Sequence, residues 1–134
     1  RLQIDEPMME RAVRTGARIL AVATHGPTVE NTKALLLETA ERAARKVSVV
    51  CATVERAFDL LGDGDVRGHN EEVARVIRRE TGRARFDAVV LAQLSMSAFM
   101  FSYPDRVAAF GLPVLTSGEE GFLKVREVLR QLPA

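Results

Sequence analysis

The stretch ARILAVATHGPT, from Ala17 to Thr28, holds the signals that decide the fold. Its first part, Ala17–Thr24, is a continuous apolar run of strand length with β-branched residues inside it. The turn His25-Gly26-Pro27 then breaks the strand, and Thr28 stands where the hydroxyl of a helix N-cap is expected. A strand that is apolar throughout is covered by helices on both faces. The stretch therefore predicts a buried strand that leads into a helix.

Three more segments have the composition of buried strands: Val47–Ala52, Phe86–Ala92 and Pro113–Leu115. Helical patterns separate and flank these strands. Five of them cover Asp5–Thr15, Thr28–Lys46 (which ends in the basic pair Arg45-Lys46), Val54–Leu61, His69–Arg83 and Gly121–Leu132. The segment Ser95–Phe110 is predicted to form two short helices with a break at Pro104. Buried strands joined by helical crossovers form a parallel, doubly wound sheet. We therefore expect one three-layer α/β/α domain over residues 1–134, with a four-stranded parallel sheet.

Composition excludes several classes of function. The 19 Lys and Arg residues nearly balance the 18 Asp and Glu residues, and Trp is absent, which disfavours a nucleic-acid partner. No stretch approaches the roughly 20 apolar residues of a membrane span, and the N-terminus lacks a signal-peptide pattern, so we expect a cytoplasmic protein with no membrane partner. The chain opens at Arg1 and enters a helical pattern almost at once, which indicates a piece of a longer protein.

The carboxyl ends of the predicted strands point to four loops, at Thr24–Thr28, Thr53–Arg56, Gln93–Ser97 and Thr116–Gly118. They are rich in Thr, His, Ser and Gln, side chains that form hydrogen bonds. Together with backbone N–H groups at helix N-termini, such side chains can hold a carboxylate or a phosphate. The alternative is that the hydroxyls simply cap helices.

Other motifs carry weaker signals. The segment GDGDVRG, Gly62–Gly68, has the wrong glycine spacing for a dinucleotide fingerprint and follows a helix, so it is interpreted as a solvent turn. His25 lies in the first strand-to-helix loop, where it could act as a general base, whereas His69 is expected to be solvated. Two histidines and one cysteine do not suffice for a metal site, so no metal is expected. Cys51 is either a small buried hydrophobe or a cleft thiolate.

The cluster from Met96 to Phe101 is apolar where a loop is expected to be polar. It either packs under the end of the sheet or forms a contact surface for another domain or subunit. The second interpretation favours a homo-oligomer and leaves open a purely structural, scaffolding role. A nucleotide-binding flavodoxin-like domain is disfavoured, because neither a glycine fingerprint nor a phosphate-binding lysine is present.

Four blocks of the chain match a known pattern in order and spacing: ILAVATHGPTVENTKALLLETA (Ile19–Ala40), AFDLLGDGDVRGHNEEV (Ala57–Val73), DAVVLAQLSMS (Asp87–Ser97) and PVLTS (Pro113–Ser117). With the opening IDEPMMERAV, they resemble the C-terminal half of the Asp/Glu/hydantoin racemase superfamily. The resemblance extends over nearly all of the chain.

The resemblance implies a two-domain protein built from two similar α/β halves, each with a four-stranded parallel sheet of flavodoxin-like type. The active site then lies in the cleft between this chain and an N-terminal half-domain of the same protein. Such proteins use no cofactor and no metal: one thiolate removes the proton next to a carboxylate or carbonyl of an amino acid or related small molecule, and a second thiol returns a proton on the opposite face.

This sequence departs from the family motif after the third predicted strand, because Gln93 stands at the position of the family's C-terminal cysteine. A carboxamide has no titratable proton near neutral pH, although it donates and accepts hydrogen bonds. The residues that match substrate-contacting positions of the family are Thr24, Thr28, Ser95, Met96, Thr116 and Ser117. The sequence thus predicts a single-cysteine racemase-like enzyme or, alternatively, a member that binds or senses a small carboxylate without turning it over.

Overall fold

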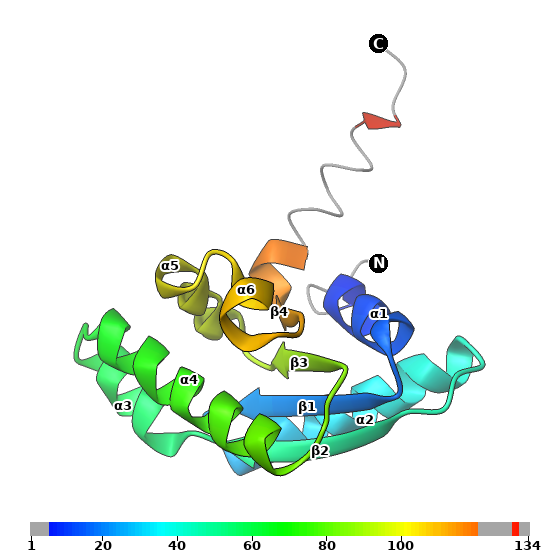
Figure 1. Cartoon of the computed structure of the whole chain (residues 1–134), viewed down its shortest axis with the longest axis horizontal. Coiled ribbons are helices and arrows are strands. Elements are labelled where there is room, and N and C mark those ends of the chain that lie inside the picture. Colours follow the sequence, from blue (N-terminus) through cyan, green and yellow to red (C-terminus); the bar gives the residue numbers. More distant parts are fainter. Residues whose placement is uncertain (1–5, 121–129, 132–134) are drawn as a thin grey trace.

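The structure of the chain, a computed structural model, describes residues 6–120 and 130–131. Figure 1 shows a sheet between layers of helices, which confirms the predicted three-layer α/β/α class. The elements in chain order are α1 (Glu6–Thr15), β1 (Arg18–Ala23), α2 (Gly26–Arg42), β2 (Ser48–Thr53), α3 (Glu55–Gly62), α4 (Val66–Arg83), β3 (Ala88–Leu91), the 3₁₀ helix η1 (Leu94–Ala98), α5 (Phe99–Ser102), α6 (Arg106–Phe110) and β4 (Val114–Thr116).

The four strands are parallel and lie in the order β2-β1-β3-β4. In the register, Ala21 of β1 lies between Cys51 of β2 and Val90 of β3, and Val90 in turn faces Leu115 of β4. Strands β2 and β3 flank β1 on opposite sides, so the direction of winding reverses between β1 and β3. Ligands of open α/β sheets bind at such a switch point, outside the carboxyl ends of the strands.

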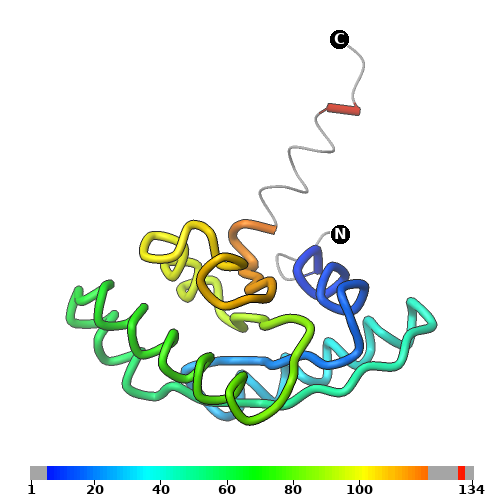
Figure 2. Tube along the Cα trace, viewed as in Figure 1, coloured from blue at the N-terminus to red at the C-terminus, as the bar shows by residue number. Residues whose placement is uncertain are grey.

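Helices cover both faces of the sheet, as the continuous apolar strands predict. Figures 1 and 2 show α2 behind the sheet and α4 in front of it. Ile19, Ala21 and Ala23 of β1 belong to the core cluster shared with α1 and α2, whereas Leu20 and Val22 belong to the cluster shared with α3, α4 and α5. Because alternate side chains of a strand point to opposite faces, one short strand contributes to both cores.

The start of α2 corrects the predicted N-cap. The helix begins at Gly26 with His25 as its N-cap, and Thr28 lies inside the first turn, so the assignment of Thr28 as N-cap is wrong. Pro27 explains the earlier start, because its fixed φ suits the first helical turn and that position needs no N–H donor. The helix also ends at Arg42, before Arg45 and Lys46.

The start of α4 corrects the prediction for His69. The helix begins at Val66, one turn earlier than expected, because the Asp65 side chain caps it and accepts a hydrogen bond from Gly68 N at 2.8 Å. This start puts His69 on the same face as Val73, and the residue is fully buried. The expectation of a solvated His69 is therefore wrong. The predicted turn at Gly62–Gly68 is shorter than expected: Asp63–Asp65 form an exposed turn, whereas Gly62 ends α3 and Val66–Gly68 begin α4.

Two expectations fall on other parts of the chain. The predicted cap at Asp5 and most of the closing helix over Gly121–Leu132 lie outside the described residues. Within residues 6–120 and 130–131, no helix combines the length and the apolar character that crossing a bilayer requires.

Candidate functional site

The parallel sheet brings the predicted loops to one edge. We call the loops at Thr24–Thr28, Thr53–Arg56, Gln93–Ser97 and Thr116–Gly118 the carboxyl edge, since each follows the carboxyl end of a strand. In Figure 1 the arrows of β1 and β3 end on the left, where α3 and α5 lie. Thr24 and Gln93 thus follow β1 and β3, and Thr116 is the last residue of β4, so the three residues lie at the same end of three adjacent strands.

Thr24 and Gln93 form a pair across the switch point. Gln93 Oε1 accepts hydrogen bonds from Thr24 N at 2.7 Å and from Thr24 Oγ1 at 2.6 Å. The two residues lie opposite each other because Val22 is in register with Leu91, two positions earlier on each strand. Thr24 is buried and Gln93 is half-buried. The Gln93 side chain therefore links the ends of β1 and β3 through two hydrogen bonds from Thr24.

Asn70 on α4 forms hydrogen bonds to the segment that follows Gln93. Asn70 Nδ2 donates to Ala98 O and to Ser102 Oγ, both at 2.9 Å, and Asn70 Oδ1 lies 2.8 Å from His69 Nδ1. Because the Asn70 nitrogen already donates twice, its oxygen is the acceptor, and His69 carries its proton on Nδ1. Asn70 was not among the residues predicted from the sequence, although a polar residue on the buried face of α4 was the available signal.

Hydroxyl groups at the end of β4 cap the turn that follows. Thr116 Oγ1 accepts from Glu119 N at 3.2 Å, and Ser97 Oγ accepts from Gly118 N at 3.1 Å. The capping alternative thus describes Thr116 and Ser97 well. Ser117 Oγ is buried and has no hydrogen-bond partner among residues 6–120 and 130–131.

The apolar cluster from Met96 to Phe101 divides into two parts. Met96 and Phe99 are fully buried in the core beside α4, so Met96 does not bring its side chain to the surface of the carboxyl edge. Phe101 is 84% exposed, and Leu94 is also exposed. Packing under the sheet therefore explains the buried residues, while a contact surface remains a prediction for Phe101. Ser95 is exposed at the same edge.

His25 is an acid–base group at the carboxyl edge. It directly follows Thr24 and is exposed, and its ring centroid lies 4.8 Å from that of Phe58 on α3. Thr28 is half-buried, one turn further along α2. The imidazole therefore packs against α3 at the carboxyl edge and remains open to solvent.

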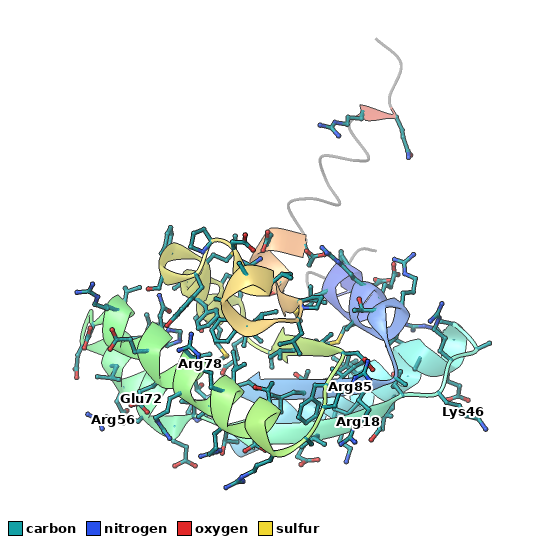
Figure 3. The ribbon with its side chains drawn as sticks, in the orientation of Figure 1. Arg18, Lys46, Arg56, Glu72, Arg78 and Arg85 are labelled. Atoms are coloured by element: carbon teal, nitrogen blue, oxygen red, sulfur yellow. The ribbon has the colours of Figure 1, made fainter. Side chains whose placement is uncertain are left out.

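Formal charge occurs at one loop of the carboxyl edge, where Glu55 and Arg56 begin α3, but not at the two loops that carry Thr24 and Gln93. Figure 3 labels Arg18, Arg85 and Lys46 on the side of the sheet where β1 begins, opposite the carboxyl edge. Arg18 lies over the Phe86 ring, with its guanidinium carbon 5.4 Å from the ring centroid. The loops Thr24–Thr28 and Gln93–Ser97 contain no Lys, Arg, Asp or Glu. These two loops therefore present hydrogen-bonding side chains without Lys, Arg or carboxylate groups.

Cys51 lies on the edge strand β2 and packs with the core cluster of α1 and α2. Its Sγ lies 3.9 Å from Val29 O, to which the thiol donates. Burial and, to a smaller extent, the Glu30 carboxylate raise the pKa of the Cys51 thiol, and Lys33 lowers it in part. A raised pKa lowers the fraction of thiolate, so the structure favours the small-hydrophobe interpretation.

The raised pKa predicts slow alkylation of Cys51. The pH at half-maximal rate of reaction with iodoacetamide is expected to be higher in the folded chain than in the urea-unfolded chain, because the thiolate is the reacting form. Glu30→Gln should move this pH down and Lys33→Gln should move it up. Since the folded thiol holds its proton more tightly, folding stability is lost as pH rises from the unfolded pKa through the folded one. Equal pH profiles for folded and unfolded chains would contradict the prediction.

Comparisons with known proteins add no assignment. The chain matches no protein-family model and no curated protein sequence. Among the described residues, no group of three or more His, Cys, Asp or Glu side chains could hold a metal ion.

Proposed function

We propose that this chain is the C-terminal half of an Asp/Glu/hydantoin racemase-like protein. In this proposal the carboxyl edge binds a small carboxylate or amino-acid-like ligand, and a proton is removed from and returned to the carbon next to its carboxylate or carbonyl. The observation that supports the proposal is the Thr24–Gln93 pair, which puts a fixed carboxamide at the switch point of a parallel sheet.

Neutral donors at the carboxyl edge suit this reaction. Removal of a proton next to a carboxylate or carbonyl moves negative charge onto the ligand's oxygen atoms. Donors already held in place stabilise such charge without reorganising during the reaction. The Gln93 amide group is a donor of this kind, because Thr24 holds its oxygen, and the exposed Ser95 hydroxyl lies two positions further along the same loop.

The proton itself must be carried by other groups. Gln93 has no titratable proton near neutral pH, and Cys51 packs against α2 with a raised pKa. We propose that the N-terminal half-domain of the same protein supplies one thiol, as the family resemblance implies. His25 is the second candidate acid or base, because it is an exposed imidazole in the loop that follows Thr24.

One observation also favours a second function, the binding or sensing of a carboxylate without turnover. Gln93 occupies the family's cysteine position, and its oxygen is engaged by two hydrogen bonds from Thr24. A residue fixed in this way recognises a ligand but does not exchange a proton with it.

Deuterium exchange distinguishes the two functions. The full-length protein is incubated in heavy water with both enantiomers of aspartate and glutamate and with hydantoins, and deuterium at the α-carbon is measured by mass spectrometry. An enzyme should exchange this hydrogen, and His25→Asn should slow the exchange. Binding of these compounds without exchange would support the sensing function, and neither binding nor exchange would contradict both.

Gln93→Cys is expected to raise the exchange rate by about a hundredfold, the size of effect typical of a positioned acid or base. The matched control is Leu94→Cys, which puts a thiol at the next position of the same loop, where the side chain is exposed. The control should leave the rate unchanged. Equal gains in both variants would show that a nearby thiol, rather than the position of residue 93, is responsible.

A further inference from the structure

We infer that Thr24 is a positioning residue that holds the Gln93 carboxamide with its Nε2 hydrogens, rather than its oxygen, toward the ligand. The site then selects an oxygen acceptor, either a carboxylate or a carbonyl, and rejects an ammonium group at this position. The inference rests on the proposed function, since it concerns the same site.

The orientation of the carboxamide follows from the chemistry of Thr24. A backbone N–H can only donate, so the atom of Gln93 that lies 2.7 Å from Thr24 N must be the oxygen. The Thr24 hydroxyl adds a second bond to the same oxygen at 2.6 Å. Turning the amide by half a rotation would face Nε2 toward the Thr24 N–H and lose that bond, whereas the Thr24 hydroxyl can either donate or accept. Loss of the backbone bond, with two donors left facing each other, favours the observed orientation by about tenfold or more.

The Thr24 hydroxyl acts through Gln93 in this arrangement. Thr24 is 1% exposed, and its hydroxyl proton is used in the bond to Gln93 Oε1. The family resemblance implies a direct substrate contact at this position. The geometry instead gives Thr24 an indirect role, in which it fixes which atoms of Gln93 remain for a ligand.

The free part of the carboxamide is a pair of donors. Among residues 6–120 and 130–131, nothing accepts a hydrogen bond from Gln93 Nε2, and Gln93 is half-buried. An ammonium group has only hydrogen-bond donors, so it finds no acceptor at Nε2. A carboxylate oxygen, by contrast, accepts hydrogen bonds from the Nε2 hydrogens. Because the two loops of the pair contain no Lys or Arg, this binding should depend little on ionic strength.

Propionate and propylammonium test the selectivity, because they differ at one end and match in length. The side-chain amide signals of Gln93 are followed in ¹⁵N–¹H spectra of the whole chain at constant ionic strength, and the signals that disappear in Gln93→Glu identify them. Propionate is expected to shift these signals, and propylammonium is not. Equal shifts from the two probes, or no shift from propionate, would overturn the inference.

Gln93→Glu is the sharpest variant, since a carboxylate still accepts both bonds from Thr24 but offers no donor. It should keep a native spectrum and weaken propionate binding by about tenfold or more, the usual effect of losing a hydrogen bond to a charged group. Undiminished binding of propionate at this edge would contradict the donor role of Gln93.

Two Thr24 variants test positioning. Thr24→Val removes the hydroxyl and keeps the shape, so the Gln93 amide signals should move and propionate binding should weaken. Thr24→Ser restores the hydroxyl and should restore both. Unchanged Gln93 signals in a folded Thr24→Val chain would contradict positioning.

Deuterium exchange is measured separately: a propionate shift without exchange refutes the proton transfer alone, and exchange without a shift at Gln93 refutes the present inference alone.

Discussion

Phe99→Ala is expected to lower the free energy of unfolding by about 3–5 kcal/mol, the range for deleting a large buried aromatic side chain. Phe99 is fully buried in the core cluster beside α4. Its ring centroid lies 4.7 Å from that of Tyr103 and 5.6 Å from that of Phe110. Deletion of the ring leaves a cavity between the sheet and three short helical segments. Urea unfolding followed by circular dichroism measures the loss.

Phe101→Ala is the matched control, because it removes the same side chain two residues away. Phe101 is 84% exposed, so its removal should change stability by no more than about 0.5 kcal/mol. Similar losses in the two variants would contradict the burial pattern of this segment. Phe99→Ala should also broaden the Gln93 amide signals, since Phe99 and the Asn70 bonds hold the segment that follows Gln93.

The architecture could be predicted because the strands have an unmistakable composition. Segments such as Ala17–Thr24 and Phe86–Ala92 are too apolar to have a solvated face, and the spacing between them leaves room for a crossover helix. Once the strands are parallel, their carboxyl ends share an edge of the sheet. The prediction that Thr24 and Gln93 lie at the same edge therefore needed no knowledge of side-chain positions.

Helix starts were less predictable, because several local signals compete within one turn. Thr28 is a good N-cap residue, but Pro27 before it is suited to the first turn, and the helix begins at Gly26. Asp65 likewise caps α4 a full turn before the predicted start. His69 was predicted to be a solvated residue at the helix start, but it lies one turn inside the helix and is buried in the core.

The contacts within the candidate site could not be predicted from sequence. The partners in the Thr24–Gln93 bonds are 69 positions apart, and those in the Asn70–Ala98 bond are 28 apart. Sequence periodicity predicts the face on which a residue lies but not the rotamer that it adopts. The sequence therefore predicts Thr24 as a ligand contact but does not predict that its hydroxyl donates to Gln93.

Gly16→Ala is expected to lower the free energy of unfolding by about 3 kcal/mol, the combined worth of two hydrogen bonds to a charged group. A Cβ atom at Gly16 would lie 2.3 Å from Asp87 Cβ and 2.6 Å from Asp87 Oδ2. The Asp87 carboxylate accepts from Ala17 N and Arg18 N, both at 3.0 Å, where β1 begins. The side chain must move away, and both bonds are then lost. Thermal and urea unfolding measure the effect.

Gly82→Ala is the control for a glycine with open space around it. Nothing lies within 4 Å of a Cβ at Gly82 in α4, so this variant should be neutral or more stable by roughly 0.5–1 kcal/mol, since alanine favours a helix.

A second test uses Asp87→Gly, which removes the atoms that a Cβ at Gly16 would meet. In that background Gly16→Ala should cost less than about 1 kcal/mol, because contacting residues are not additive. A full loss in both backgrounds would mean that the contact with Asp87 is not the cause.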